Sequence, residues 1–92
     1  MDSAKLQYII DCLPTEELLC QLAEEASELA HAALKLRRCY DNTNPTPVPK
    51  EDALTGLFEE IADVWLVIQT LDLDQQANVR RYKQIMAGKV DR

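Results

Sequence analysis

Two groups of carboxylates at helical spacing are the residues of this chain that point most directly to chemistry. The segment EEASE at residues 24–28 is followed by EEIAD at residues 59–63, and apolar residues recur at helical spacing around both. Each group holds two carboxylates three residues apart, which are neighbours on a helix surface. Two such pairs facing each other favour a divalent cation, and all-oxygen ligands suit Mg²⁺ or Mn²⁺ better than zinc. The predicted metal ligands are Glu25, Glu28, Glu60 and Asp63.

Together the two groups form the pattern E-E-x-x-E followed by E-x-x-D, which resembles the MazG-like, all-α nucleoside triphosphate pyrophosphohydrolases. That superfamily also includes the dimeric dUTPases and phosphoribosyl-ATP pyrophosphatase. The resemblance covers roughly residues 15–72. It implies Mg²⁺-dependent hydrolysis of a (d)NTP to the monophosphate and pyrophosphate, in the housekeeping of the nucleotide pool. The metal would stabilise the charge that develops at the attacked α-phosphorus.

The same resemblance implies roles for further residues. Glu24 and Glu25 are predicted to be catalytic, with Glu24 as a support for the ligands or as the general base. Because Glu24 lies about 100° from Glu25 around a straight helix, we do not expect both to bind the metal directly. Lys35 lies on nearly the same face as Glu28, about 10 Å along the helix, and it suits a phosphate contact and the helix C-terminus equally well. The predicted substrate contacts are Lys35, Asn78 and Arg81.

Two interpretations compete with this metal site. The acidic residues can form a solvated helix face without a metal, although such a face normally lies opposite the apolar stripe. Alternatively, Glu28-x-x-His31 matches the Glu/His pairing of di-iron helix bundles. The second acidic group ends in Asp63 rather than in histidine, however, and His31 is the only histidine of the chain. His31 is therefore predicted to be a surface or packing residue.

The functional assignment has alternatives as well. Phosphoribosyl-ATP pyrophosphatase differs from the favoured activity in its substrate, and a helical metal-binding or interaction module would keep the scaffold without turnover. Trp65 offers a flat ring on which a nucleobase can stack. Its position on the helical wheel is more than about 100° from Glu60 and Asp63, so packing in the core or in an interface is the favoured role for Trp65.

The composition places these residues in a single all-α domain. The chain has 92 residues, is 47% apolar and 28% charged, contains only two glycines, and is rich in Leu, Ala and Glu. Such a chain is long enough for one small core. We predict one domain over residues 1–92, folded as an antiparallel bundle of about four helices.

Charge and cysteine content narrow the classes of partner and the compartment. The formal net charge of −6 argues against nucleic-acid binding through a basic surface. No charged leader precedes an apolar segment, and the longest apolar run, residues 64–68, is too short to span a bilayer. Three cysteines without C-x-x-C spacing indicate reduced thiols. We predict a cytoplasmic protein that binds a small nucleotide and contacts neither nucleic acid nor membrane.

Capping residues and prolines divide the chain into helices. The first predicted helix begins after Ser3 and is ended by Pro14, and the second is capped by Thr15 and runs to about residue 40. A proline-containing loop over residues 41–49 is predicted to be extended and exposed, as a connector rather than as a lid. The third helix runs from about residue 50 to residue 71. The last is capped by Asp72 or Asp74 and ends near Gly88 as its C′ residue.

Helical wheels locate the carboxylates relative to the apolar stripes. Both acidic pairs are predicted to lie at the edge of the buried face of their helix. The two predicted stripes consist of Leu18, Leu22, Leu29 and Leu36, and of Leu57, Ile61, Val64, Ile68 and Leu71. The third helix has more apolar residues away from its stripe, namely Phe58, Ala62, Trp65 and Leu66. A helix that is apolar nearly all round must be covered on more than one side, which predicts a homodimer or a dimer of dimers.

Overall fold

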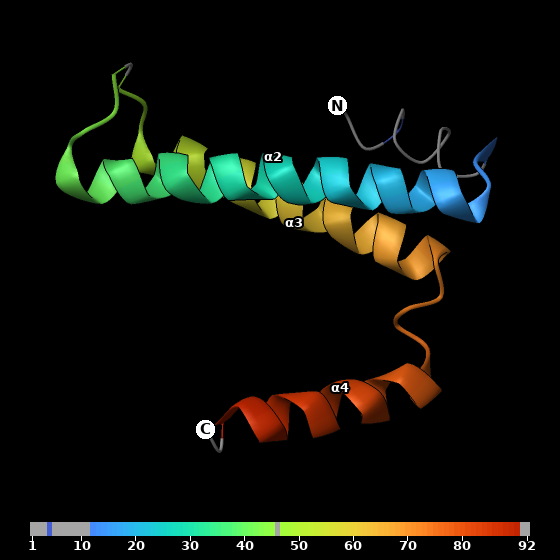
Figure 1. Cartoon of the computed structure of the whole chain (residues 1–92). Helices are drawn as coiled ribbons and strands as arrows, with labels where there is room; N and C mark the ends of the chain where they lie inside the picture. The colour runs from blue at the N-terminus through green and yellow to red at the C-terminus, as the bar shows by residue number, and fades with distance from the viewer. Residues whose placement is uncertain (1–3, 5–11, 46, 91–92) are drawn as a thin grey trace.

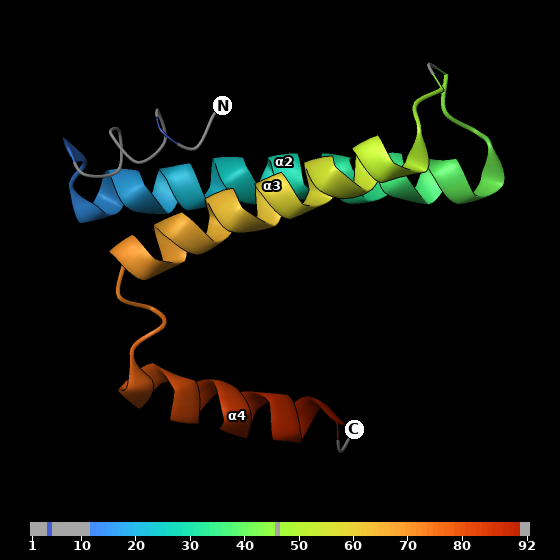
Figure 2. The same ribbon diagram turned by 180° about the vertical axis from the view of Figure 1, so that it is seen from behind.

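The structure is a computed structural model that describes residues 4, 12–45 and 47–90, and each regular element in these ranges is an α-helix. The helices are α2 (Thr15–Asp41), α3 (Lys50–Thr70) and α4 (Gln76–Val90). α2 and α3 pack against each other as an antiparallel hairpin, and α4 stands apart from both (Figure 1). The view from behind shows the same separation (Figure 2). The all-α prediction is confirmed, whereas most of the predicted first helix lies outside the described residues.

Prolines begin α2 and α3 in place of side-chain caps. The carbonyl of Pro14 accepts the backbone N–H groups of Glu17 and Leu18, each at 3.0 Å. Thr15 is therefore the first residue of α2, and the prediction that it caps the helix is wrong. Pro49 begins α3 in the same way. A residue just before a helix needs its carbonyl but not its N–H, so proline is tolerated there.

The loop after α2 is tied back onto the end of that helix. Asn42 ends α2 in a left-handed conformation with φ 59°, which asparagine adopts more readily than most residues. The Asn44 side chain accepts the Nε–H of Arg38 at 3.0 Å and donates to the Lys35 carbonyl at 3.3 Å. Asn44 and Val48 are half-buried. The prediction of an exposed loop is therefore wrong for these two residues.

The core between α2 and α3 is small. The buried apolar residues of the described chain are Leu18, Ala53 and Val67, of which Val67 is 0% exposed. The half-buried residues packed around Leu18 and Val67 are Leu13, Leu22, Leu66 and Leu71. Ile61 was expected to face inward, but it is 46% exposed. The inward face of α3 is thus rotated away from the predicted stripe, because Ala53, Asp63 and Val67 occupy it.

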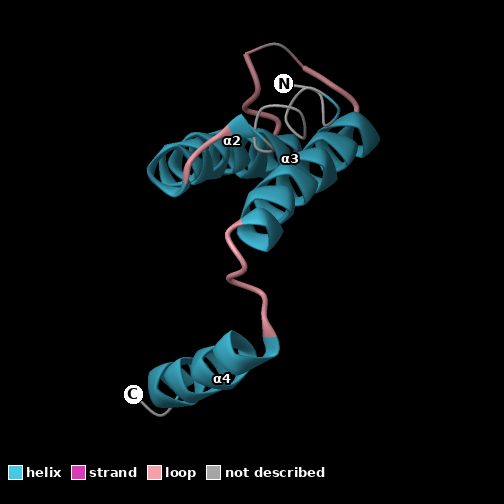
Figure 3. Ribbon diagram, turned by 90° about the vertical axis from the view of Figure 1, so that its right-hand side faces the viewer, coloured by secondary structure: helices cyan, strands magenta, loops and turns pink. Residues whose placement is uncertain are grey.

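α4 follows a turn over residues 71–75 and has no buried residue. Figure 3 shows α2 and α3 together, with α4 at the far end of this turn. The carbonyl of Gln75 accepts the N–H groups that open the helix, so neither Asp72 nor Asp74 is its cap. Asp72 instead takes a left-handed conformation with φ 59° inside the turn.

The end of α4 also differs from the prediction. The helix continues through Gly88 to Val90 instead of ending at Gly88. Open space surrounds Gly88, so no packing contact makes the chain turn there, and one glycine in a helix costs only about 1 kcal/mol. Among the described helices, none has the length and apolarity needed to cross a membrane.

Candidate metal centre

Three carboxylates from the two packed helices meet in the hairpin. Glu25 comes from α2, Glu60 and Asp63 come from α3, and one oxygen of each lies within 4.8 Å of the others. Glu25 is 1% and Asp63 3% exposed, while Glu60 is half-buried. Both deeply buried acids lie within the contact face of their helix, not at its edge as predicted. The interpretation of a solvated acidic face is therefore wrong for Glu25 and Asp63.

Burial and the charges of neighbouring carboxylates disfavour the charged forms of Glu25 and Glu60. Burial raises the pKa of Glu25 above its ordinary value, and the nearby charge of Asp63 raises it further. Burial likewise raises the pKa of Glu60, followed by the charges of Glu28 and Asp63. The Gln21 side chain donates from Nε2 to Oε1 of Glu25 at 2.8 Å and offsets part of the rise. A positive charge placed among these groups would reverse the direction of both shifts.

Two oxygens of the cluster are suited to bind such a charge. Oε2 of Glu25 and Oε2 of Glu60 are buried and have no hydrogen-bond partner within the described part of the chain. A buried carboxylate oxygen without a partner is costly, and most buried polar atoms are paired. Hard carboxylate oxygens converging from two helices match the donor set of Mg²⁺ or Mn²⁺. The residues present therefore fit a divalent cation.

A groove with a cavity volume of about 680 Å³ runs beside the cluster between α2 and α3. Because the helices are antiparallel, Glu28 of α2 and Glu60 of α3 lie toward one end of the groove. Lys35 and Arg38, two and three turns further along α2, line its other end. The groove is thus acidic at the cluster, while toward the loop Lys35 and Arg38 outnumber Asp52, an arrangement suited to a polyanion bound through a metal.

The structure brings together some of the predicted site residues and leaves others apart. Glu24 and Glu28 line the groove, but Glu28 stands outside the three-carboxylate cluster. Lys35 lines the groove as predicted. Asn78 and Arg81 lie on α4, away from the hairpin. The Asn78 side chain donates to the backbone carbonyl of Asp72, in the turn that precedes α4. Within one chain the two predicted contacts on α4 are therefore remote from the cluster.

Two residues of the site were not among the predicted ones. Gln21 binds Glu25, and its position four residues earlier on the same helix is the spacing that identifies such pairs. Arg38 lines the groove, although it was not among the predicted substrate contacts. His31 is exposed, as predicted, at the groove wall. It does not join the carboxylate cluster, so the described chain lacks the Glu/His arrangement of a di-iron site.

Comparison with known proteins leaves the site to be interpreted from its own geometry. No family model, curated protein or solved structure gives a significant match to this chain.

Proposed function

We propose that this protein is a Mg²⁺-dependent nucleoside triphosphate pyrophosphohydrolase that releases a monophosphate and pyrophosphate. The observation that carries the proposal is the buried cluster of Glu25, Glu60 and Asp63, in which two carboxylate oxygens have no partner among the described residues. The resemblance of the two acidic motifs to MazG-like enzymes supports the same activity. Nucleotide-pool housekeeping in the cytoplasm is the corresponding role, and Mn²⁺ is the expected substitute metal.

The groove supports a division of labour among its residues. Glu25, Glu60 and Asp63 would hold the metal, with Glu28 beside them. A bound Mg²⁺ supplies charge neutralisation and orientation of phosphate oxygens. Glu24, exposed on the groove wall, is placed to accept a proton from a water molecule that enters the groove.

The basic end of the groove would receive phosphate oxygens. Lys35 offers a mobile ammonium group, whereas Arg38 is held by its Nε–H donation to Asn44. A guanidinium fixed in this way loses little freedom when it binds phosphate. The cavity volume of about 680 Å³ also lies within the range of small-molecule sites.

The test is release of pyrophosphate from a panel of canonical and damaged (d)NTPs and from phosphoribosyl-ATP, in Mg²⁺, by the wild type and two variants. Glu60→Gln removes one charge from the cluster, and Glu59→Gln makes the same change at an exposed neighbour. We expect kcat to fall at least about 100-fold in Glu60→Gln and by less than about threefold in Glu59→Gln.

The ranking of substrates identifies the preferred base, and turnover of phosphoribosyl-ATP alone would assign the histidine-biosynthetic member of the superfamily. No release from any substrate by the folded protein would refute the activity and leave a metal-binding module. Equal losses in the two variants would contradict the assignment of the cluster as the reaction centre.

We also propose that the protein is a homo-oligomer, a dimer or a dimer of dimers. Phe58 and Trp65 of α3 remain exposed in the single chain, which supports cover by another subunit.

A further inference from the structure

α3, the turn after it and α4 border a second cavity, separate from the groove of the acidic cluster. Its volume of about 460 Å³ lies within the range of small-molecule sites. Among the described residues, none lines both the groove and this cavity. A ligand of this cavity would therefore be distinct from the substrate of the groove. The cavity walls are Trp65, Ile68, Leu73, Asp74, Val79 and Tyr82.

Aromatic and aliphatic side chains make up most of the wall. Trp65 of α3 and Tyr82 of α4 contribute two aromatic rings, and both residues are exposed. The apolar stripe of α4 consists of Val79, Tyr82 and Met86, all of them exposed, and the first two of these border the cavity. Aromatic rings attract a cation through their negative faces, and aliphatic side chains pack against apolar groups. The wall therefore suits a ligand that has an apolar body and a positive charge.

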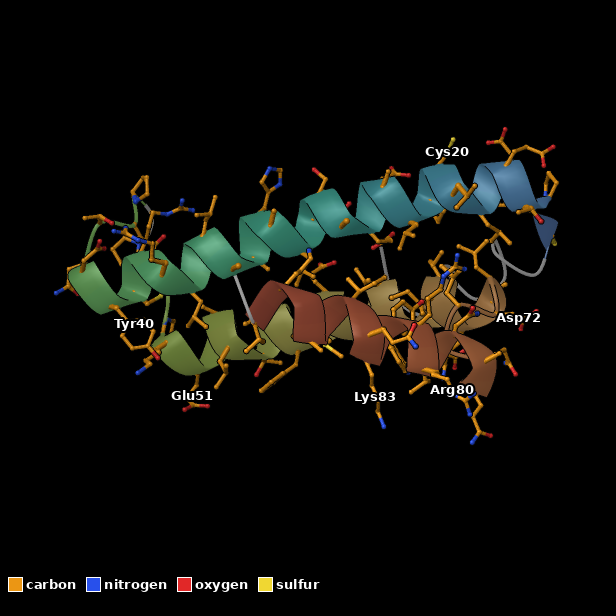
Figure 4. All side chains as sticks on the ribbon, turned by 60° about the horizontal axis from the view of Figure 1, so that its bottom comes forward. Cys20, Tyr40, Glu51, Asp72, Arg80 and Lys83 are labelled. Carbon is orange, nitrogen blue, oxygen red and sulfur yellow. The ribbon has the colours of Figure 1, made fainter. Side chains whose placement is uncertain are left out.

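One carboxylate interrupts this apolar wall. Oδ1 of Asp74 is shielded from water and has no hydrogen-bond partner within the described part of the chain. The described residues contribute no basic side chain to the wall, and Figure 4 shows Arg80 and Lys83 projecting from α4 on the side away from α2. A carboxylate that is partly cut off from water is costly until a positive charge or a hydrogen-bond donor compensates it. The cavity thus favours a cation that can also donate a hydrogen bond.

Hydrogen bonds of the turn hold the cavity walls in place. The Tyr82 hydroxyl donates to the carbonyl of Leu73 at 2.6 Å, and the backbone N–H of Leu73 donates to the carbonyl of Ile68 at 3.1 Å. These two bonds link one wall residue of α3, one of the turn and one of α4. A site whose walls are fixed before binding loses little conformational freedom when a ligand enters.

We propose that this cavity binds a small organic cation, a primary ammonium group carried on an aromatic or other apolar body. The ammonium group would donate to the carboxylate of Asp74 beside the two rings, and the body would pack on the aliphatic wall. A metal ion fits less well, because a single carboxylate among apolar walls gives it too few oxygen ligands. The site lies within one chain and needs neither the metal nor the reaction proposed above.

Trp65 is the only tryptophan of the chain, so its fluorescence reports binding at this cavity. The probe is phenethylammonium, titrated without nucleotide or metal, and the control ligand is phenethyl alcohol, which has nearly the same shape but no charge. We expect the ammonium ion to bind at least about tenfold more tightly than the alcohol. Equal affinities, or no binding of either ligand at millimolar concentrations, would overturn the proposal.

Two substitutions each remove one carboxylate charge from the same turn. Asp74→Asn should lower the affinity for phenethylammonium at least about tenfold and leave the affinity for the alcohol unchanged. Asp72→Asn makes the same change at an exposed residue outside the cavity walls. Asparagine suits the left-handed backbone at that position, and the affinity should change by less than about twofold. Equal losses in the two variants would indicate a general attraction to the acidic surface and would overturn the assignment.

The acidic cluster offers an ammonium ion a competing site, which Glu60→Gln tests. We expect this variant to bind phenethylammonium as the wild type does. A loss in Glu60→Gln without a loss in Asp74→Asn would place the cation in the cluster and overturn the proposal. Helix content, measured by circular dichroism for every variant, separates loss of binding from loss of folding.

Because the titration uses neither nucleotide nor metal, binding of the ammonium ion without pyrophosphate release would refute the activity and keep this site. The reverse result would keep the activity and refute the site.

Discussion

The α2–α3 hairpin and α4 distribute polar and apolar residues in opposite ways. In the hairpin, Glu25 and Asp63 are among the most buried residues, whereas Phe58 and Trp65 are exposed. α4 buries nothing and turns its apolar stripe toward an open cavity. The hairpin thus packs around a cluster of carboxylates, whereas α4 keeps its apolar residues on the surface.

This difference separates two contributions to stability. In the hairpin a small apolar core opposes repulsion among buried carboxylates, so the binding of a cation should stabilise folding directly. At α4 the hydrogen bonds to the turn maintain a helix without burying it. The stability of α4 should therefore depend more on protein concentration than on metal. Variants placed in one region at a time test this separation.

The largest effect is expected from a charge in the core of the hairpin. Val67→Asp places a carboxylate where exposure is 0% and should lower the free energy of unfolding by about 4 kcal/mol. Val90→Asp makes the same change at the exposed end of α4 and should cost less than about 1 kcal/mol. Urea unfolding followed by circular dichroism measures both. Similar losses in the two variants would contradict the claim that the core lies between α2 and α3 alone.

The next largest effect separates the contribution of Glu25 to metal binding from its contribution to the stability of the fold. Glu25→Gln removes one buried charge and keeps the shape of the side chain. Without metal the variant should be more stable than the wild type, because the burial and repulsion that raise the pKa of Glu25 no longer oppose folding. Its affinity for Mg²⁺ should be roughly 100-fold lower. Calorimetric titration and urea unfolding in EDTA give the two quantities. A lower stability in EDTA together with an unchanged affinity for Mg²⁺ would indicate that Glu25 serves only the packing.

The same cluster predicts how stability depends on pH. The unfolded carboxyl groups titrate near their ordinary value of 4.5, whereas the pKa values of Glu25 and Glu60 are raised in the folded protein. Between the two values the folded state holds more protons, so the free energy of unfolding falls as pH rises through this window. Below it the penalty is absent, and above the raised values it is complete.

Mg²⁺ should flatten this pH dependence, because a cation displaces the extra protons. Urea unfolding in EDTA across the window, with Glu25→Gln as the reference, isolates the contribution of Glu25. A difference between the two proteins that does not change with pH would exclude the raised pKa as its cause.

Much of the fold followed from local rules in the sequence, and the failures have physical causes. Prolines and polar residues marked the loop and the extents of α2 and α3 to within about two residues. The helical wheel misplaced the inward face of α3, because it weights the apolar Ile61 above the charged Asp63, whereas the carboxylate cluster occupies the contact with α2. Local propensity and global arrangement are expected to disagree at such a site.

The spacing of acidic residues in the sequence predicted which carboxylates belong to the site, but not which of them meet in the structure. Acids three residues apart identified Glu25, Glu60 and Asp63, yet spacing alone could not separate Glu28 from the cluster. That distinction depends on how the two helices are rotated about their axes, which packing decides. Arg38 was missed as a groove residue because its position depends on the loop, through the bond to Asn44.

The smallest effect compares two adjacent arginines of α2. Arg38 lines the groove, while Arg37 forms a solvent-exposed salt bridge with Asp41 at 2.8 Å. Arg38→Ala should raise KM for the nucleoside triphosphate about tenfold, because a positioned guanidinium is lost from the phosphate end of the groove. Arg37→Ala should leave KM unchanged and alter the free energy of unfolding by less than about 0.5 kcal/mol, since exposed ion pairs contribute little. Because both changes remove the same charge from the same turn, a general loss of attraction for the anionic substrate would raise KM equally in both. An effect confined to Arg38→Ala would instead identify the groove between the acidic cluster and the loop as the place where the phosphates bind.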